Sequence, residues 1–216
     1  MTDRRERLHA ARLYLVCDAV PESFLDQALG GGVDIVQLRM KQASEEAILC
    51  AAGPFARRCA EHGALFILND RPDLVDETGA DGVHVGQDDA SVASARALVG
   101  DERLVGLSTH TAAQVDAAAG VDYIGVGPVH ETPTKPGRPA VGLELVRHAA
   151  AHSGVPFFAI GGIDAHNAAA VRAAGGMRVA VVRALTEAED PAIAARELRA
   201  AIGADRTPSE ARVGAA

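Results

Sequence analysis

The sequence has no tryptophan, and only two tyrosines and five phenylalanines among its 216 residues. Large rings therefore contribute little to its core. That core must come from the aliphatic side chains within the 48% of residues that are hydrophobic. Such side chains suit the close packing of helices on a sheet. No apolar run approaches the roughly 18 residues of a membrane-spanning helix, so we expect no membrane partner.

Positive charge is also scarce. The chain has 21 Lys and Arg residues against 29 Asp and Glu residues, which gives a net charge of −8 at pH 7. A protein without a broad basic face does not attract the nucleic-acid backbone, so we expect no nucleic-acid partner. Cations that serve a function should instead be clustered at one site. Small molecules are then the expected partners, and a homodimer is the assembly to test.

Cysteine is rare, and the spacing of the cysteines does not suggest pairs. Cys17, Cys50 and Cys59 are odd in number and show no C-x-x-C motif. This pattern argues against a disulfide framework and favours a reducing compartment. The opening residues, MTDRRERLHAAR, are charged and lack the apolar centre of a secretory signal. We therefore expect a cytoplasmic protein.

Short apolar runs alternate with alanine-rich stretches along the chain. The runs predict strands at 13–17, 33–39, 64–69, 82–86, 103–108, 121–127, 156–162 and 178–183. The stretches between them predict helices at 44–63, 91–100, 111–120, 143–154 and 164–175. Four of these helices begin at residues that commonly cap a helix, namely Ser44, Ser91, Thr111 and Asp164.

This alternation predicts right-handed strand–helix–strand units and a parallel sheet. Eight strands favour an α/β protein of the (β/α)8 TIM barrel type, formed by a single domain over residues 1–204. A doubly wound open sheet is the alternative, because the fourth unit, ADGVHVGQDD, is short. Residues 205–216 show no apolar period and are expected to form a flexible tail.

Cations gather where the carboxyl ends of the strands would meet, which is where barrel enzymes carry their chemistry. In QLRMK, the two-residue period of a strand places Gln37, Arg39 and Lys41 on one side. A guanidinium and an ammonium both suit phosphate oxygens. Two solvated cations at a strand edge would be the plainer interpretation. The proline-rich loop TPTKPGRP adds Lys135 to the same rim, and this third cation favours a polyanion site.

Carboxylates follow two successive strands of the same rim. Asp70 ends one strand and Asp89 follows the next, although an Asp after a strand is often only a turn or capping residue. Mg2+ binds one or two protein carboxylates together with substrate phosphates. With three cations expected nearby, we predict that Asp70 and Asp89 bind Mg2+. Asp88 is a rival to Asp89 that spacing alone does not separate.

A second anion site is expected after the seventh strand. Gly161 and Gly162 precede a helix, and glycines there let a phosphate approach the backbone. A tight turn would be the plainer interpretation. The next strand ends in VVRAL, which supports the phosphate site because the seventh and eighth loops share one in many barrels. His84 lies between two valines, and we interpret it as a core histidine rather than a base.

Two anion sites on one rim indicate a transferase. A diphosphate held by metal and cations is a leaving group, and the second phosphorylated molecule would be the nucleophile. In this context the chain resembles the thiamine-phosphate synthase family. The resemblance rests on QLRMK, LFILNDRPDLVDETGADGVHVGQDD, GLSTHT, YIGVGPVHETPTKPGRPAVGLE and AIGGID, in that order.

The resemblance implies that 4-amino-5-hydroxymethyl-2-methylpyrimidine diphosphate is joined to a thiazole phosphate by a dissociative substitution. The implied ligands of the pyrimidine diphosphate are Gln37, Arg39, Lys41, Asn69, Ser108 and Lys135. The implied ligands of the thiazole phosphate are Thr132, Thr134, Gly161, Gly162, Val182 and Arg183. Arg39, Lys41, Ser108 and Lys135 would act in catalysis, and Asp70 and Asp89 would bind Mg2+. Family members often have a small hydroxyl residue where this chain has Arg183.

Two other functions compete with this interpretation. A related barrel of thiamine metabolism, a thiazole tautomerase, needs neither Mg2+ nor a diphosphate site. A barrel that binds a phosphorylated ligand without turnover is the second. The combination of Asp70, Asp89 and Lys135 argues against the tautomerase, and the full set of catalytic-type residues argues against the binding protein.

Overall fold

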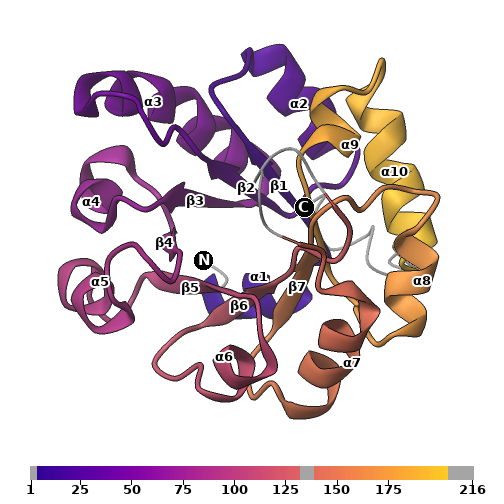
Figure 1. Ribbon diagram of the computed structural model, residues 1–216. Helices are drawn as coiled ribbons and strands as arrows, with labels where there is room; N and C mark the ends of the chain where they lie inside the picture. Colours follow the sequence, from indigo (N-terminus) through magenta and orange to yellow (C-terminus); the bar gives the residue numbers. More distant parts are fainter. Residues whose placement is uncertain (1–3, 132–138, 204–216) are drawn as a thin grey trace.

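A computed structural model describes residues 4–131 and 139–203, and this part of the chain forms a closed barrel of eight parallel strands (Figure 1). The strands pair in sequence order, and β8 closes the barrel on β1. Their bounds are β1 Leu13–Cys17, β2 Ile35–Leu38, β3 Leu65–Asn69, β4 Gly82–Val85, β5 Leu104–Thr109, β6 Tyr123–Val126, β7 Phe157–Ile160 and β8 Val179–Val181. The predicted barrel is therefore confirmed, and each strand lies within a residue or two of its expected position.

Helices surround the strands in Figure 1. Their bounds are α1 Arg4–Ala10, α2 Glu22–Gly30, α3 Glu45–His62, the 3-10 helix η1 Pro72–Leu74, α4 Val75–Thr78, α5 Val92–Val99, α6 Ala112–Asp116, α7 Gly142–His152, α8 Ala168–Ala173, α9 Arg183–Thr186 and α10 Pro191–Ala201. None of the described helices is long and apolar enough to cross a membrane.

Three of the four expected helix caps are confirmed. The side chains of Ser44, Ser91 and Thr111 each accept a hydrogen bond from the backbone N–H three residues later. The prediction for Asp164 was wrong, because α8 begins after Asn167. The Asp164 carboxylate instead accepts from the N–H groups of His166 and Asn167, which forms a turn ahead of the helix.

Apolar residues form two cores separated by the strands. The larger core lies between the strands and the outer helices and consists of aliphatic side chains with few rings. The smaller core fills the inside of the barrel and includes Tyr14, Ile35, Leu65, Tyr123 and Phe158. The two-residue period of each strand sends alternate side chains to these two cores. Both tyrosines of the chain therefore lie inside the barrel.

Helix α1 closes the amino-terminal end of the barrel through apolar and ionic contacts. Leu8 packs against the inner core. Arg4 pairs with Asp81 at 2.8 Å, and Arg5 pairs with Asp122 at 2.9 Å. The other Asp122 oxygen accepts from the Val105 N–H at 2.8 Å, so one carboxylate ties α1 to the start of β5.

Asp122→Asn should destabilise the fold more than a matched surface change. The Asp122 side chain is 9% exposed and also pairs with Arg96 at 2.5 Å. Removing its charge takes the carboxylate away from two guanidinium groups that otherwise donate to backbone carbonyls, which we expect to cost about 2 kcal/mol of unfolding free energy. Asp116 pairs with His148 but is 51% exposed. Asp116→Asn should therefore cost under about 0.5 kcal/mol in urea titrations. Equal losses of unfolding free energy in the two variants would show that the Asp122 contacts do not stabilise the barrel.

Candidate active site

A cavity of about 320 Å3 opens at the carboxyl end of the barrel. Residues from most of the strands and from the loops after them line it. Its floor is the top of the inner core, where Tyr14, Tyr123 and Phe158 pack edge to face. This volume lies in the range of small-molecule sites.

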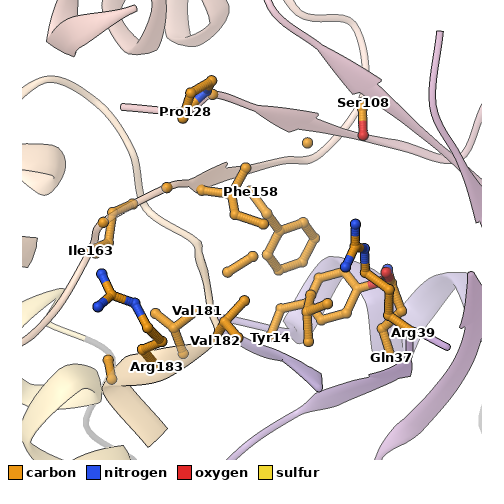
Figure 2. Close-up of a pocket in the computed structure, with 18 of the residues that line it drawn as sticks. Tyr14, Gln37, Arg39, Ser108, Pro128, Phe158, Ile163, Val181, Val182 and Arg183 are labelled. Carbon is orange, nitrogen blue, oxygen red and sulfur yellow. The ribbon is translucent and has the colours of Figure 1, made fainter. Parts of the chain in front are cut away.

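The cavity carries a guanidinium at each end and an apolar floor between them. Figure 2 shows Arg39 on one side, next to Gln37 and Tyr14, and Arg183 on the other side, near Ile163. Phe158 and Val181 lie between the two arginines in the same view. Such an arrangement suits a ligand pair with two anionic ends and an uncharged middle.

Strand β2 and the turn after it supply the Arg39 end. Gln37 and Arg39 both line the cavity, as their alternation predicts. Gln37 is buried, and its amide nitrogen donates to the Tyr14 hydroxyl at 2.5 Å, so its side chain is fixed from below. Lys41 lies beyond the end of the strand and beside Asp70, and it is not part of the cavity lining. Gln37, Arg39 and Lys41 therefore lie at the same rim, but only Gln37 and Arg39 line the cavity.

Two carboxylates and one ammonium form a compact cluster beside this end. Lys41 Nζ lies 2.9 Å from Asp70 Oδ2 and 3.7 Å from Asp89 Oδ1. The Asp70 and Asp89 carboxyl groups are also within hydrogen-bond reach of each other. Burial, and then the neighbouring Asp89, raise the pKa of Asp70, while Lys41 acts in the opposite direction. Two crowded carboxylates favour a cation between or beside them.

Backbone geometry fixes both carboxylates in place. Asp70 has a left-handed backbone with φ of 59°, and its side chain accepts from Asn69 Nδ2 at 2.6 Å. Asp89 Oδ2 accepts from the Gly86 N–H at 3.0 Å. Of the two rival aspartates, Asp89 is the one placed beside Asp70 and Lys41. A non-glycine residue held at positive φ is costly, and such strain gathers at functional sites.

The Arg183 end is formed by the loops after β7 and β8. Gly161, Gly162, Val182 and Arg183 all line the cavity. The two glycines have φ of 106° and 61°. A Cβ at Gly161 would collide with Pro128, and one at Gly162 would collide with His130. These glycines are therefore required by the contact with the loop after β6, whether or not they also approach a phosphate.

The remaining predicted residues divide into two groups. Ser108 and Asn69 line the cavity. Thr132, Thr134 and Lys135 lie outside the described residues, so their assignments stay predictions. Tyr14, Tyr123 and Phe158 form the cavity floor, a role that the sequence patterns do not predict. Their only signal was that both tyrosines of the chain fall at the starts of apolar strands.

Comparison with known proteins places the chain among enzymes of thiamine synthesis. Residues 13–185 match the family model described as thiamine monophosphate synthase. A thiamine-phosphate synthase of Saccharopolyspora erythraea is 52% identical over 214 residues, covering 92% of this chain and 96% of that protein. A thiamine-phosphate synthase of Thermobifida fusca is 52% identical over 205 residues, covering 90% of this chain and 94% of that protein. A solved thiamine phosphate pyrophosphorylase from Pyrococcus furiosus is 30% identical with a TM-score of 0.82, covering 92% and 97%.

Proposed function

The chain belongs to the thiamine monophosphate synthase family and is a transferase that forms thiamine phosphate, and we propose that it joins the pyrimidine diphosphate to the thiazole phosphate within this one cavity. The observation that carries the proposal is the separation of two cationic ends by an apolar floor. The diphosphate would lie at the Arg39 end and the thiazole phosphate at the Arg183 end. The carbon and nitrogen that become bonded would then meet above Phe158.

The carboxylate cluster fits Mg2+. Asp70 and Asp89 are close enough to interact, and a cation, Lys41, already lies beside both of them. Among the described residues no group of three or more His, Cys, Asp and Glu side chains could hold a metal. Substrate phosphates and water would therefore complete its coordination, as is usual for Mg2+. When bound, Mg2+ would supply charge to stabilise the departing diphosphate.

The side chains of this end would stabilise the negative charge that develops on the leaving group. Arg39 offers a two-pronged donor at the cavity wall, and Lys41 offers a point charge at its edge. Lys135 would add a third cation from the loop after β6. Fixed charges of this kind lower the barrier because they need no rearrangement as the bond breaks. A dissociative reaction, in which the diphosphate leaves before the new bond forms, gains most from them.

The floor and the far end would orient the nucleophile. Phe158, Val181 and the ring of Tyr14 present apolar surface to the two heterocycles. Arg183, with Gly161 and Gly162, would hold the thiazole phosphate and so direct the ring nitrogen toward the reacting carbon. The thiazole substrate would be the alcohol phosphate or its carboxylated tautomer. The cytoplasmic location and the homodimer stay predictions.

A turnover assay tests this proposal. Both substrates would be incubated with the protein, with and without Mg2+, and thiamine phosphate would be detected after oxidation to fluorescent thiochrome. We expect product only with Mg2+, released together with one diphosphate per product. Binding of the thiazole phosphate without product would contradict the proposal. It would indicate a tautomerase or a binding protein instead.

A further inference from the structure

A chain of hydrogen-bonded side chains crosses the inside of the barrel directly beneath the cavity. The amide of Gln37 contacts the Tyr14 hydroxyl at 2.5 Å, and that hydroxyl lies 3.0 Å from the hydroxyl of Tyr123. Tyr123 lies 3.2 Å from His84 Nδ1, and His84 Nε2 lies 2.9 Å from Ser108 Oγ. Four strands, β1, β2, β4 and β6, are thus linked to Ser108 on β5.

The donors and acceptors of these hydrogen bonds follow one direction, which the amide of Gln37 sets. Gln37 Nε2 donates to the Tyr14 oxygen, so the Tyr14 hydroxyl proton must find another acceptor. The Tyr123 hydroxyl lies 3.0 Å away and can accept it, and a buried hydroxyl left without an acceptor is costly. The Tyr123 proton then points to His84 Nδ1, which leaves the imidazole proton on Nε2. When each hydroxyl and ring nitrogen in turn is given a hydrogen-bond partner, the Nε2–H group of His84 donates to Ser108 Oγ.

This direction has a consequence for Ser108. Because its oxygen accepts from His84, its own hydroxyl proton is available to donate toward the cavity, which Ser108 lines. In the reverse direction the Ser108 proton would be given to His84, and Ser108 could only accept from a ligand. The diphosphate oxygens and the ring nitrogens of the pyrimidine are acceptors, so the first direction serves them, whereas the reverse direction would serve only the 4-amino group.

The surroundings keep both tyrosines neutral and the side chains closely packed. Tyr14 and Tyr123 are fully buried, and burial raises the pKa of both hydroxyls well above the usual range. A Cβ at Gly106 would collide with the hydroxyl of Tyr123 and with Nδ1 of His84. Gly106 on β5 therefore leaves the space in which the Tyr123–His84 hydrogen bond forms. Tyr14 is only 2% exposed and Tyr123 0% exposed, so neither hydroxyl is suited to rapid proton exchange with water.

We propose that Tyr123 is a positioning residue of the reaction: through His84 it holds the Ser108 hydroxyl as a hydrogen-bond donor to the pyrimidine diphosphate. The inference rests on the proposed role of Ser108 as a ligand of that substrate. Tyr123 acts at a distance, since two hydrogen bonds separate its hydroxyl from Ser108 Oγ. A purely structural Tyr123 would satisfy Tyr14 and contribute to stability only.

A double-mutant cycle separates these two roles. Tyr123→Phe removes the hydroxyl and keeps the ring, and should lower kcat about tenfold while the thiazole-phosphate KM stays within about twofold. Ser108→Ala should cause a loss at least as large. The double variant should match Ser108→Ala alone, because both changes remove one pathway. Phe55→Leu, in a buried aromatic pair outside the barrel, is the stability-matched control and should leave kcat within about twofold.

Three outcomes of the cycle are distinct. Losses that multiply in the double variant, or an unchanged kcat in Tyr123→Phe, would overturn the positioning role. An unchanged kcat in Ser108→Ala would instead show that the proposed substrate contact is wrong, and the inference would fall with it. Tyr14→Phe interrupts the hydrogen-bonded side chains one bond earlier and should show the same non-additivity with Ser108→Ala. It provides the test if Tyr123→Phe does not fold.

Histidine NMR on the wild-type protein tests the direction without any substrate. In protein labelled with 15N-histidine, the His84 resonances would be assigned by their loss in His84→Gln. We expect His84 to be neutral with its proton on Nε2. A proton on Nδ1 would mean that Ser108 donates to His84, and the proposal would be wrong whatever the kinetics show.

Discussion

Asp70→Asn should remove most of the metal-dependent turnover and leave the protein at least as stable as before. We expect kcat at saturating Mg2+ to fall about 100-fold or more, because one of two metal-binding carboxylates becomes a neutral amide. The amide keeps the shape of the side chain. Asparagine also tolerates the left-handed backbone of this position, where φ is 59°, better than most residues do.

The stability expectation follows from the pKa of Asp70. Burial and the nearby Asp89 raise that pKa above its unfolded value, so the ionised carboxylate costs stability at neutral pH. The cost grows as the pH rises through the region above the unfolded pKa, and it disappears at acidic pH where Asp70 is protonated in both states. Asp70→Asn should therefore gain stability relative to the wild type at pH 7 and lose that gain at about pH 3, below the unfolded pKa.

Urea titrations at both pH values and kcat measured against Mg2+ concentration test the two halves of this prediction. Asp116→Asn is the matched control, since this exposed carboxylate pairs with His148 and does not line the cavity. We expect its kcat to stay within about twofold of wild type. Full activity of Asp70→Asn at an unchanged Mg2+ requirement would mean that Asp70 is not a ligand.

Arg39→Ala and Arg183→Ala should affect opposite ends of the cavity. Arg39→Ala should lower kcat about 100-fold, because a charge that stabilises the leaving group is lost, with the thiazole-phosphate KM changed less than about threefold. Arg183→Ala should raise the thiazole-phosphate KM about tenfold and change kcat much less. Steady-state kinetics with each substrate varied in turn would measure both effects.

Lysine at each position sharpens the comparison. A lysine keeps the charge but loses the two-pronged donor, so Arg39→Lys and Arg183→Lys should recover part of the corresponding loss. Equal losses of kcat and KM in the two alanine variants would contradict the division of the cavity into two anion sites. An Arg183→Ala variant with unchanged KM would show that backbone groups alone hold the phosphate at that end.

The fold could be predicted from the sequence because its signals are local. Each strand is a short run of apolar residues, and capping side chains such as Ser44 and Ser91 reach backbone groups only three residues away. Asp164 shows the limit of such signals. Its carboxylate does cap backbone N–H groups, but those of a turn, and the helix begins four residues later, at Ala168.

The site could be predicted only as far as strand ends converge. Arg39, Asp70 and Asp89 were found because their positions after strands place them on one rim. The link from Tyr14 to Tyr123 spans 109 residues, and no local pattern indicates it. It depends on how the inner side chains of β1 and β6 meet across the barrel, which only the three-dimensional packing defines. The displacement of Lys41 from the cavity wall toward Asp70 likewise depends on the turn after β2.

A structure of the protein with thiamine phosphate, diphosphate and Mg2+ bound together would test the two-ended cavity most directly. The expected result is the diphosphate beside Arg39 and Lys41, with the metal on Asp70 and Asp89 and the phosphate of thiamine phosphate beside Gly162 and Arg183. The reverse orientation, or a metal bound away from the two aspartates, would contradict the assignment of the leaving group to the Arg39 end.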